Sequence, residues 1–278
     1  MIMKKQMIIA LLALLPVLGW GQKYDGIRVS YHAGPTAHFW NPKPFNTFVE
    51  SYNTYMASLL ESPLTEFKST SSSFSRGFGG WSESNGFVFG MDYLKSQFNP
   101  TIESSFKNGR GNLIELEFTD WMVNVELGKR FGTRWVINSI TGVNLRSGVV
   151  RVNVIHFDGS LSQGDEFYFA GVYRSVVQSD FTLGVKLRFD LAPFASITFS
   201  GIRTLPFFDT EESRSLRTFE DDRPGKALST IVFPADYQKY EENAQNGIYD
   251  YENNIIPMDF RGWYINASLA LNLKILKL

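Results

Sequence analysis

Residues 263–275 read WYINASLALNLKI, and this stretch near the C-terminus decides the fold. Its odd positions are apolar or aromatic, and most of its even positions are polar. Successive side chains of a strand point to opposite faces, so a period of two predicts a strand with one apolar face. The run is longer than ten residues. Strands of soluble proteins average about five or six residues, whereas a tilted strand needs about ten to cross a bilayer.

The same alternation recurs upstream, at 27–33, 121–128 and 180–191. In each stretch one face is apolar, while the other face carries polar or charged residues. A soluble β-sandwich also alternates, with its apolar face turned to a core. The length of these strands favours a membrane barrel instead, in which the apolar face contacts lipid and the polar face fills the lumen.

The spacing of turn residues predicts about eight strands. They span roughly 26–33, 74–81, 86–97, 112–131, 134–157, 166–191, 194–205 and 259–277. We therefore expect an all-β fold, an antiparallel transmembrane up-and-down β-barrel with one short loop helix. Short turns of such barrels are periplasmic and long loops extracellular, so both termini are expected in the periplasm, and the extracellular loops at 34–73, 99–111 and 206–257.

Two long strands change the parity of their apolar positions, near 119–120 and near 149–150. A β-bulge inserts one residue and moves the apolar set to the other face, so a bulge is predicted at each place. These strands also exceed what a bilayer crossing needs. We expect them to project above the membrane and to support the loops.

The N-terminus predicts export. Lys4 and Lys5 precede a short apolar run at 7–18, and Gly19 and Gly21 occupy the small-residue positions of a cleavage site. This arrangement is typical of a secretory signal peptide, here residues 1–21, which leaves 22–278 as the mature barrel. The run is shorter than the ~20 residues of a membrane-spanning helix. The expected location is the outer membrane of a Gram-negative bacterium, crossed many times by strands.

The composition argues against nucleic-acid binding and excludes cysteine chemistry. Aromatic residues make up 15 % of the 278 residues, the net charge is −1 and cysteine is absent. The charge gives no global attraction to nucleic acid, so none is expected as a partner. Without cysteine the chain has no disulfide, thiol nucleophile or iron–sulfur site.

The first long loop predicts a helix at 47–61. Thr47 and Glu50 have the spacing of a capping box. Four residues then follow one helical face: Phe48, Tyr52, Tyr55 and Leu59. The helix either lies across the barrel mouth with this face buried, or rests on the membrane, or offers the face to a partner protein.

The last long loop, 206–257, is acidic, with eleven acidic and five basic residues. It lacks the Asp-x-Asp-x-Asp-Gly pattern of a calcium loop, so we expect a solvated surface segment. Tyrosine supplies contact area at low entropic cost, and it is enriched at interfaces. Partner contacts are therefore predicted at Tyr237, Tyr240, Tyr249 and Tyr251.

The lumen of an eight-stranded barrel is just wide enough for side chains to fill. Buried charges there must be paired, because desolvation costs several kcal/mol per ion. The polar faces of the strands predict one interlocked network that plugs the lumen: Arg28, Asp92, Glu126, Arg130, Arg146, Asp180, Lys186, Arg188 and Lys274.

Motifs of catalysis are missing from the sequence. It has neither a metalloprotease His-Glu-x-x-His nor a Gly-x-Ser-x-Gly elbow, a phosphate loop or a dinucleotide fingerprint. The histidines are His32, His38 and His156, and their spacing suggests no zinc site. Histidines at rim height leave a lipid-modifying barrel enzyme as one alternative. The favoured expectation is no enzyme, no cofactor and no metal.

The chain resembles the small outer-membrane β-barrel proteins of Bacteroidota. The resemblance rests on Gly19-Trp20-Gly21 before Gln22 and on the alternating final strand, which here ends in Leu278 rather than an aromatic residue. That group includes pores, structural barrels and accessory subunits of secretion and protein-insertion machines. The resemblance implies outer-membrane lipid and other outer-membrane or surface proteins as partners. An accessory subunit of a complex is the preferred prediction, with a small pore or stand-alone surface barrel as the alternative.

Overall fold

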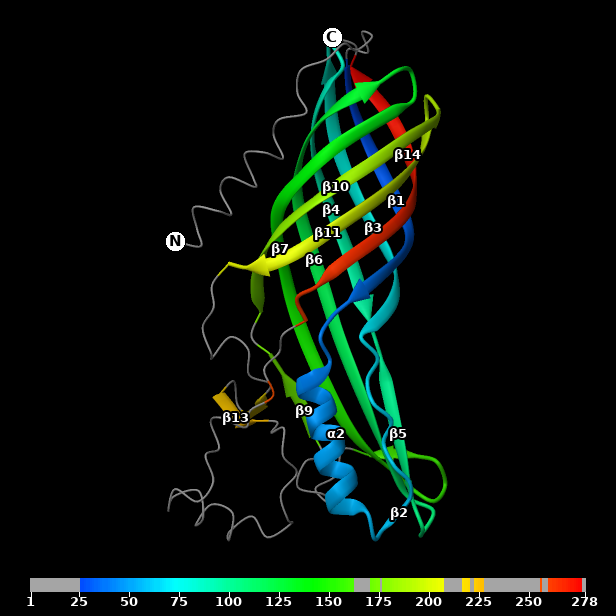
Figure 1. The fold of residues 1–278 in the computed structure, drawn as a ribbon, viewed down its shortest axis with the longest axis vertical. Coiled ribbons are helices and arrows are strands. Elements are labelled where there is room, and N and C mark those ends of the chain that lie inside the picture. The colour runs from blue at the N-terminus through cyan, green and yellow to red at the C-terminus, as the bar shows by residue number, and fades with distance from the viewer. Residues whose placement is uncertain are drawn as a thin grey trace.

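A computed structural model describes residues 26–162, 171–175, 177–207, 217–220, 223–227, 256 and 260–276. Eight long antiparallel strands form a closed ring in it (Figure 1). They are β1 (Gly26–Phe39), β3 (Thr70–Ser84), β4 (Phe87–Phe98), β6 (Gly111–Phe131), β7 (Trp135–Ile155), β10 (Gln178–Ala192), β11 (Ala195–Pro206) and β14 (Trp263–Leu276). The predicted signal peptide lies outside the described residues.

The first and last strands close the ring. β1 pairs with β14 from Ile27 opposite Leu276 to Phe39 opposite Trp263. Every other ring strand pairs with its two neighbours in the order β1, β3, β4, β6, β7, β10, β11, β14. The ring therefore has no free edge strand. The prediction of an antiparallel barrel of about eight strands is confirmed.

Several loops are shorter, or more ordered, than predicted. β1 continues to Phe39 and β3 begins at Thr70, so the first long connection is 40–69 rather than 34–73. The sixth ring strand begins at Gln178, not near 166. Further strands lie outside the ring: β2 (Leu60–Ser62), β5 (Thr101–Phe106), β8 (Leu161–Ser162), β9 (Gly171–Arg174), β12 (Arg217–Glu220) and β13 (Arg223–Ala227). β5 pairs with β6 and lies within the predicted loop 99–111.

A band of apolar side chains covers the outside of the ring. Its members include Tyr31, Phe78, Phe89, Met91, Val123, Val185, Phe199, Ile265, Leu269 and Leu271, each more than two-fifths exposed. Their inward neighbours on β14, Asn266 and Asn272, are buried. Apolar outside and polar inside is the arrangement of a barrel in lipid. Among the described residues, no helix is long and apolar enough to cross a bilayer.

The polarity of the two faces reverses toward the end of the molecule that carries the helix. On β6 the even residues stay inward along the whole strand, but they change from Asn124 and Glu126 to the buried Leu116 and Ile114. Outward residues change from Val123 to Glu115 and Glu117. On β7 the buried Val150, Val152 and Val154 follow the same rule.

The two predicted bulges are therefore wrong. β6 pairs with β7 without a shift of register, from Gly111 opposite Ile155 to Phe131 opposite Trp135. The apolar parity changes because the surroundings change. Within the apolar band the outer face contacts lipid, whereas beyond it the outer face contacts water and the inner face becomes the core.

Helix α2 (Lys43–Met56) fills the space inside this end of the barrel wall, beside β5, β6 and β7 (Figure 1). The predicted capping box at Thr47 is wrong, because the helix begins one turn earlier. Pro42 precedes the first turn, without a side-chain cap. Proline suits a helix start because the first amide groups lack partners in any case. Thr47 lies in the second turn of the helix, and its hydroxyl donates to the carbonyl oxygen of Lys43 over 3.0 Å.

An apolar core joins the helix to the strands. Phe45, Phe48, Val49, Tyr52 and Met56 are the buried residues of α2. They belong to one cluster with the inward residues of β4, β5, β6 and β7. We call this end of the molecule the extension: residues 40–69, 99–118 and 148–162. It is a water-exposed domain built on strands that begin in the membrane.

Candidate functional site

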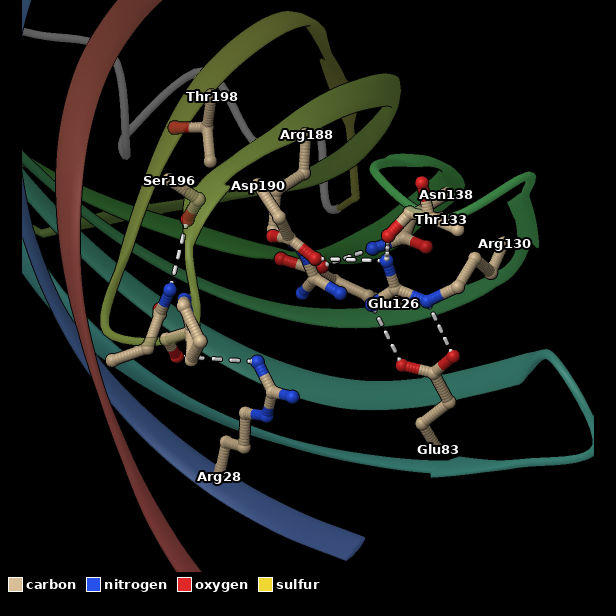
Figure 2. Close-up of polar contacts among 12 residues, drawn as sticks. Arg28, Glu83, Glu126, Arg130, Thr133, Asn138, Arg188, Asp190, Ser196 and Thr198 are labelled. Atoms are coloured by element: carbon tan, nitrogen blue, oxygen red, sulfur yellow. Dashed lines mark hydrogen bonds and ion pairs between the residues drawn. The ribbon is translucent and has the colours of Figure 1, made fainter. Parts of the chain in front are cut away.

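Three clusters of charged side chains fill the barrel interior. Near the short turns, Arg130 lies between two carboxylates from other strands (Figure 2). Its Nε and Nη2 donate to both oxygens of Glu83, at 2.6 and 2.9 Å, and its Nη1 donates to Asp190 at 2.8 Å. Such a bidentate pair fixes distance and direction together, and so ties β3 and β10 to β6.

The middle cluster centres on Lys186. Its ammonium group donates to Glu126 over 2.6 Å and to Asp92 over 3.1 Å. Asn138 donates to the second oxygen of Glu126 at 2.6 Å, and the His32 ring lies 3.4 Å from Asp92. Two carboxylates share one ammonium group, and β1, β4, β6, β7 and β10 all contribute a side chain.

The third cluster lies at the end of the lumen nearest the extension, where the inward residues change from polar to apolar. Arg146 donates to Asp120 at 2.6 Å, to Asp180 at 3.3 Å and to the Tyr264 hydroxyl at 2.7 Å. Tyr264 in turn donates to Asp120 over 2.8 Å. The tyrosine ring stacks on His38, with ring centroids 4.1 Å apart, and the aromatic core of the extension begins there.

Eight of the nine residues expected in a lumen network lie inside the barrel. They are Arg28, Asp92, Glu126, Arg130, Arg146, Asp180, Lys186 and Arg188. Seven of them are buried, and the side chain of Lys186 is 12 % exposed. Lys274 is exposed and contributes nothing to the clusters, because it lies close to the end of β14.

Sequence reasoning missed several members of the clusters, among them Glu83, Asp120 and Tyr264. Glu83 lies on a strand rich in serine and glycine, where alternation is weak. Asp120 lies at the point where the apolar positions change parity, and Tyr264 reads as apolar among the polar positions of its strand. Their position in the register, opposite inward residues of neighbouring strands, is the signal that could have found them.

Two cavities border the clusters. A cavity of about 20 Å³ lies among His32, Trp81, Asp92, Lys186 and Arg188. A void of that size holds about one water molecule. Near the short turns, a hollow of about 300 Å³ is lined by Arg28, Thr133, Arg134, Asp190 and Pro193, among others.

The predicted partner contacts on the helix divide into two pairs. Phe48 and Tyr52 are 3 % and 0 % exposed, so they hold the helix on the sheet and cannot reach a partner. Burial also raises the pKa of the Tyr52 hydroxyl. Tyr55 and Leu59 are 42 % and 54 % exposed. The tyrosines predicted in the last loop, 237–251, lie outside the described residues.

His156 has one neighbour of chemical interest. Its Nε2 lies 2.7 Å from the Ser162 hydroxyl, across the exposed hairpin between β7 and β8. Asp158 of the same turn accepts hydrogen bonds from Ser160 instead of orienting the histidine. Among the described residues, no third group orients the pair as a triad would require. Within the described part of the chain, no group of three or more His, Asp or Glu side chains is arranged to hold a metal.

A closed antiparallel ring, an apolar outer band and charged clusters in the lumen together define a transmembrane β-barrel, the form in which outer-membrane proteins cross lipid. No protein-family model matches the sequence, and no curated protein matches it. The fold is similar to solved outer-membrane barrels. OprG from Pseudomonas aeruginosa has 6 % identity and a TM-score of 0.48, with 91 % of this chain and 99 % of that chain covered.

Two further structures are similar in the same way. Ail, the attachment invasion locus protein of Yersinia pestis, has 10 % identity and a TM-score of 0.39, with 90 % of this chain and 100 % of that chain covered. The outer membrane protease OmpT from Escherichia coli has 10 % identity and a TM-score of 0.36, with 93 % and 99 % covered. At these identities and TM-scores, the likenesses assign no activity, ligand or partner to this chain.

The prediction that the chain is not an enzyme, which rested on its missing catalytic motifs, is wrong. One of the similar barrels is a protease, so a barrel architecture does not exclude catalysis. The three structures come from Pseudomonas, Yersinia and Escherichia, and a specific link to Bacteroidota remains a prediction.

Proposed function

We propose that the protein is an outer-membrane anchor that presents a rigid extracellular domain to a partner protein, as an accessory subunit of an outer-membrane complex. The single observation behind this proposal is the exchange of polarity along β6 and β7. The same strands form a membrane wall at Val123 and a water-exposed domain with its own core at Leu116.

The turns support one direction of the barrel in the membrane. Short turns join β3 to β4, β6 to β7 and β10 to β11, and all lie opposite the extension (Figure 1). Short turns are periplasmic in barrels of this class. The extension is then extracellular, and both ends of the ring, at Gly26 and Leu276, are periplasmic.

The filled lumen favours an anchor over a pore. Glu83, Arg130 and Asp190 bridge one level of the barrel, and Asp120, Arg146 and Tyr264 bridge another. A solute would have to break charge-assisted hydrogen bonds at both levels. Each such bond contributes about 1.5–3 kcal/mol.

Site-directed photocrosslinking in the native outer membrane tests the proposal. A photoreactive residue at Leu59, an exposed position beside the helix, should give one discrete protein adduct. The same residue at Leu269, an equally exposed position of the apolar band, should give none. If Leu59, Tyr55 and the exposed Phe157 all give only monomer while the barrel is folded, the extension has no protein partner and the proposal fails.

A further inference from the structure

The outer face of the ring is uncharged across the apolar band and becomes basic where the band ends. On the side of the extension, the outward cations of the ring strands are Arg76, Lys95, Arg151 and Arg203, and Arg151 is paired with Glu117. Lys95 lies eight residues beyond Phe87, which starts β4. At about 3.3 Å per residue and a tilt of about 40°, this distance is about 20 Å along the barrel axis. The apolar band of such barrels is about 25 Å tall, so Lys95 lies near its upper edge.

Two of these cations stand directly opposite each other. Arg76 of β3 pairs with Lys95 of β4, and Lys95 pairs with Trp121 of β6. Opposed residues have Cβ atoms about 4.5–5.5 Å apart, and like charges so placed repel. The Lys95 ammonium group also lies 5.8 Å from the centre of the Trp121 ring. Within the described ring strands, no other two outward cations are opposed.

No carboxylate of the described residues neutralises this pair. The nearest outward acid on the adjoining strand is Glu117, and it is already engaged. It accepts a hydrogen bond from Gln97 at 3.1 Å and forms an ion pair with Arg151 at 2.7 Å. Two uncompensated like charges beside an apolar surface are costly unless an external anion joins them.

Apolar surface flanks the two cations. Phe74 and Phe78, two residues on either side of Arg76, are 69 % and 64 % exposed. The ring of Phe78 contacts Tyr93, with centroids 5.0 Å apart. Free phosphate would use only the cations, whereas a lipid would also place its acyl chains on these side chains.

We propose that Arg76 and Lys95 bind the phosphate of an anionic membrane lipid in the leaflet on the side of the extension. The Arg76 guanidinium can donate two parallel hydrogen bonds to phosphate oxygens, and Lys95 supplies a second positive charge. Trp121 lies at the level where aromatic side chains meet headgroups. Arg203, a further outward arginine, sits over Trp263, and its register partners in the described ring strands, Leu183 and Trp263, are not cations.

Native mass spectrometry of the detergent-purified protein tests the site. Two lipids with the same acyl chains serve as probes: phosphatidic acid, and diacylglycerol, which lacks the phosphate. Wild type should bind phosphatidic acid in preference to diacylglycerol. Losing charge-assisted hydrogen bonds should reduce the affinity of the R76Q/K95Q variant for phosphatidic acid about tenfold or more.

The matched control is K43Q/K68Q, which removes the same charge from exposed lysines of the extension. It should keep the wild-type preference. The proposal is overturned if R76Q/K95Q also keeps that preference, or if the control loses it to the same degree. Inorganic phosphate at millimolar concentration should leave the lipid bound. If it strips the lipid from wild type, the ligand is the free anion and the lipid assignment is wrong.

Discussion

The guanidinium of Arg146 donates a hydrogen bond to the hydroxyl oxygen of Tyr264 across the barrel interior, over 2.7 Å. The two residues lie on β7 and β14, which are not neighbours in the ring. The Tyr264 hydroxyl in turn donates a hydrogen bond to Asp120 at 2.8 Å, while its ring packs against His38. This contact therefore joins the polar lumen to the apolar core of the extension.

Tyr264→Phe should destabilise the barrel. The substitution leaves Arg146 and Asp120 each short of one buried partner, and an unsatisfied buried group costs about 1–3 kcal/mol. The free energy of unfolding in urea, measured in lipid, checks this loss. Tyr31→Phe is the control, because Tyr31 is 53 % exposed on the outer face. Equal losses for the two variants would mean that the hydroxyl of Tyr264 contributes nothing.

The fold was predictable because alternation is clear in most ring strands, although it is weak in the serine- and glycine-rich β3. The sequence could not tell which medium each face meets. Ile114 and Leu116 have the opposite parity to Val123, and a bulge was one way to explain the change. The structure keeps one register and exchanges lipid for water instead. A period of two shows which face of a strand is apolar. Which face points into the barrel is known only from the pairing of the strands.

The interior was predictable in kind but not in pairing. Arg130 and Arg146 were expected inside, yet their shortest carboxylate partners, Glu83 and Asp120, were not. Which carboxylate meets which cation depends on the stagger of strands far apart in the sequence. The helix start was missed for a local reason, since Pro42 and Pro44 opened the helix before the expected cap at Thr47.

The same substitution should destabilise the barrel at one outward leucine and have little effect at another. Leu269 lies in the apolar band, so Leu269→Lys should cost about 2–4 kcal/mol if it is near the bilayer midplane. Leu113 points outward on the extension, opposite Glu103 of β5, so Leu113→Lys should change stability by no more than about 0.5 kcal/mol. Urea unfolding in lipid vesicles measures both. Similar costs at the two positions would contradict the boundary drawn between membrane and extension.

Leu116→Ala should loosen the extension. Leu116 is 0 % exposed in the core shared with the helix, and removing a buried leucine side chain costs about 2–5 kcal/mol. We expect faster amide exchange in residues 43–56 and earlier protease cleavage of the connection 40–69, with the barrel still folded. Leu127→Ala, on the outer face of the same strand, should leave both unchanged. Unaltered exchange in the helix would show that it does not depend on this core.

The purified monomer should show no steady conductance in a planar bilayer. The reason is geometric, since the cavity beside the middle cluster, lined by His32, Trp81 and Lys186 among others, has a volume of about 20 Å³. Arg130→Ala combined with Arg146→Ala removes the cations that bridge two levels, and should raise the frequency of open events. Steady current steps from the wild-type monomer would show that a water path passes these clusters.

Arg130 and Glu83 should be energetically coupled. The loss of stability should be larger for the Arg130 variant than for the Glu83 variant. Arg130→Met leaves the buried Glu83 without its cation, while Asp190 keeps Arg188 at 3.3 Å, so a loss of about 3–5 kcal/mol is expected. Glu83→Gln leaves Arg130 its contact with Asp190, so the loss should be smaller. The double variant should be less destabilised than the sum of the two single variants, because contacting residues do not act additively. Urea unfolding of the four proteins gives the coupling energy. Strict additivity would mean that the bidentate contact, at 2.6 and 2.9 Å, contributes no net stability to the barrel.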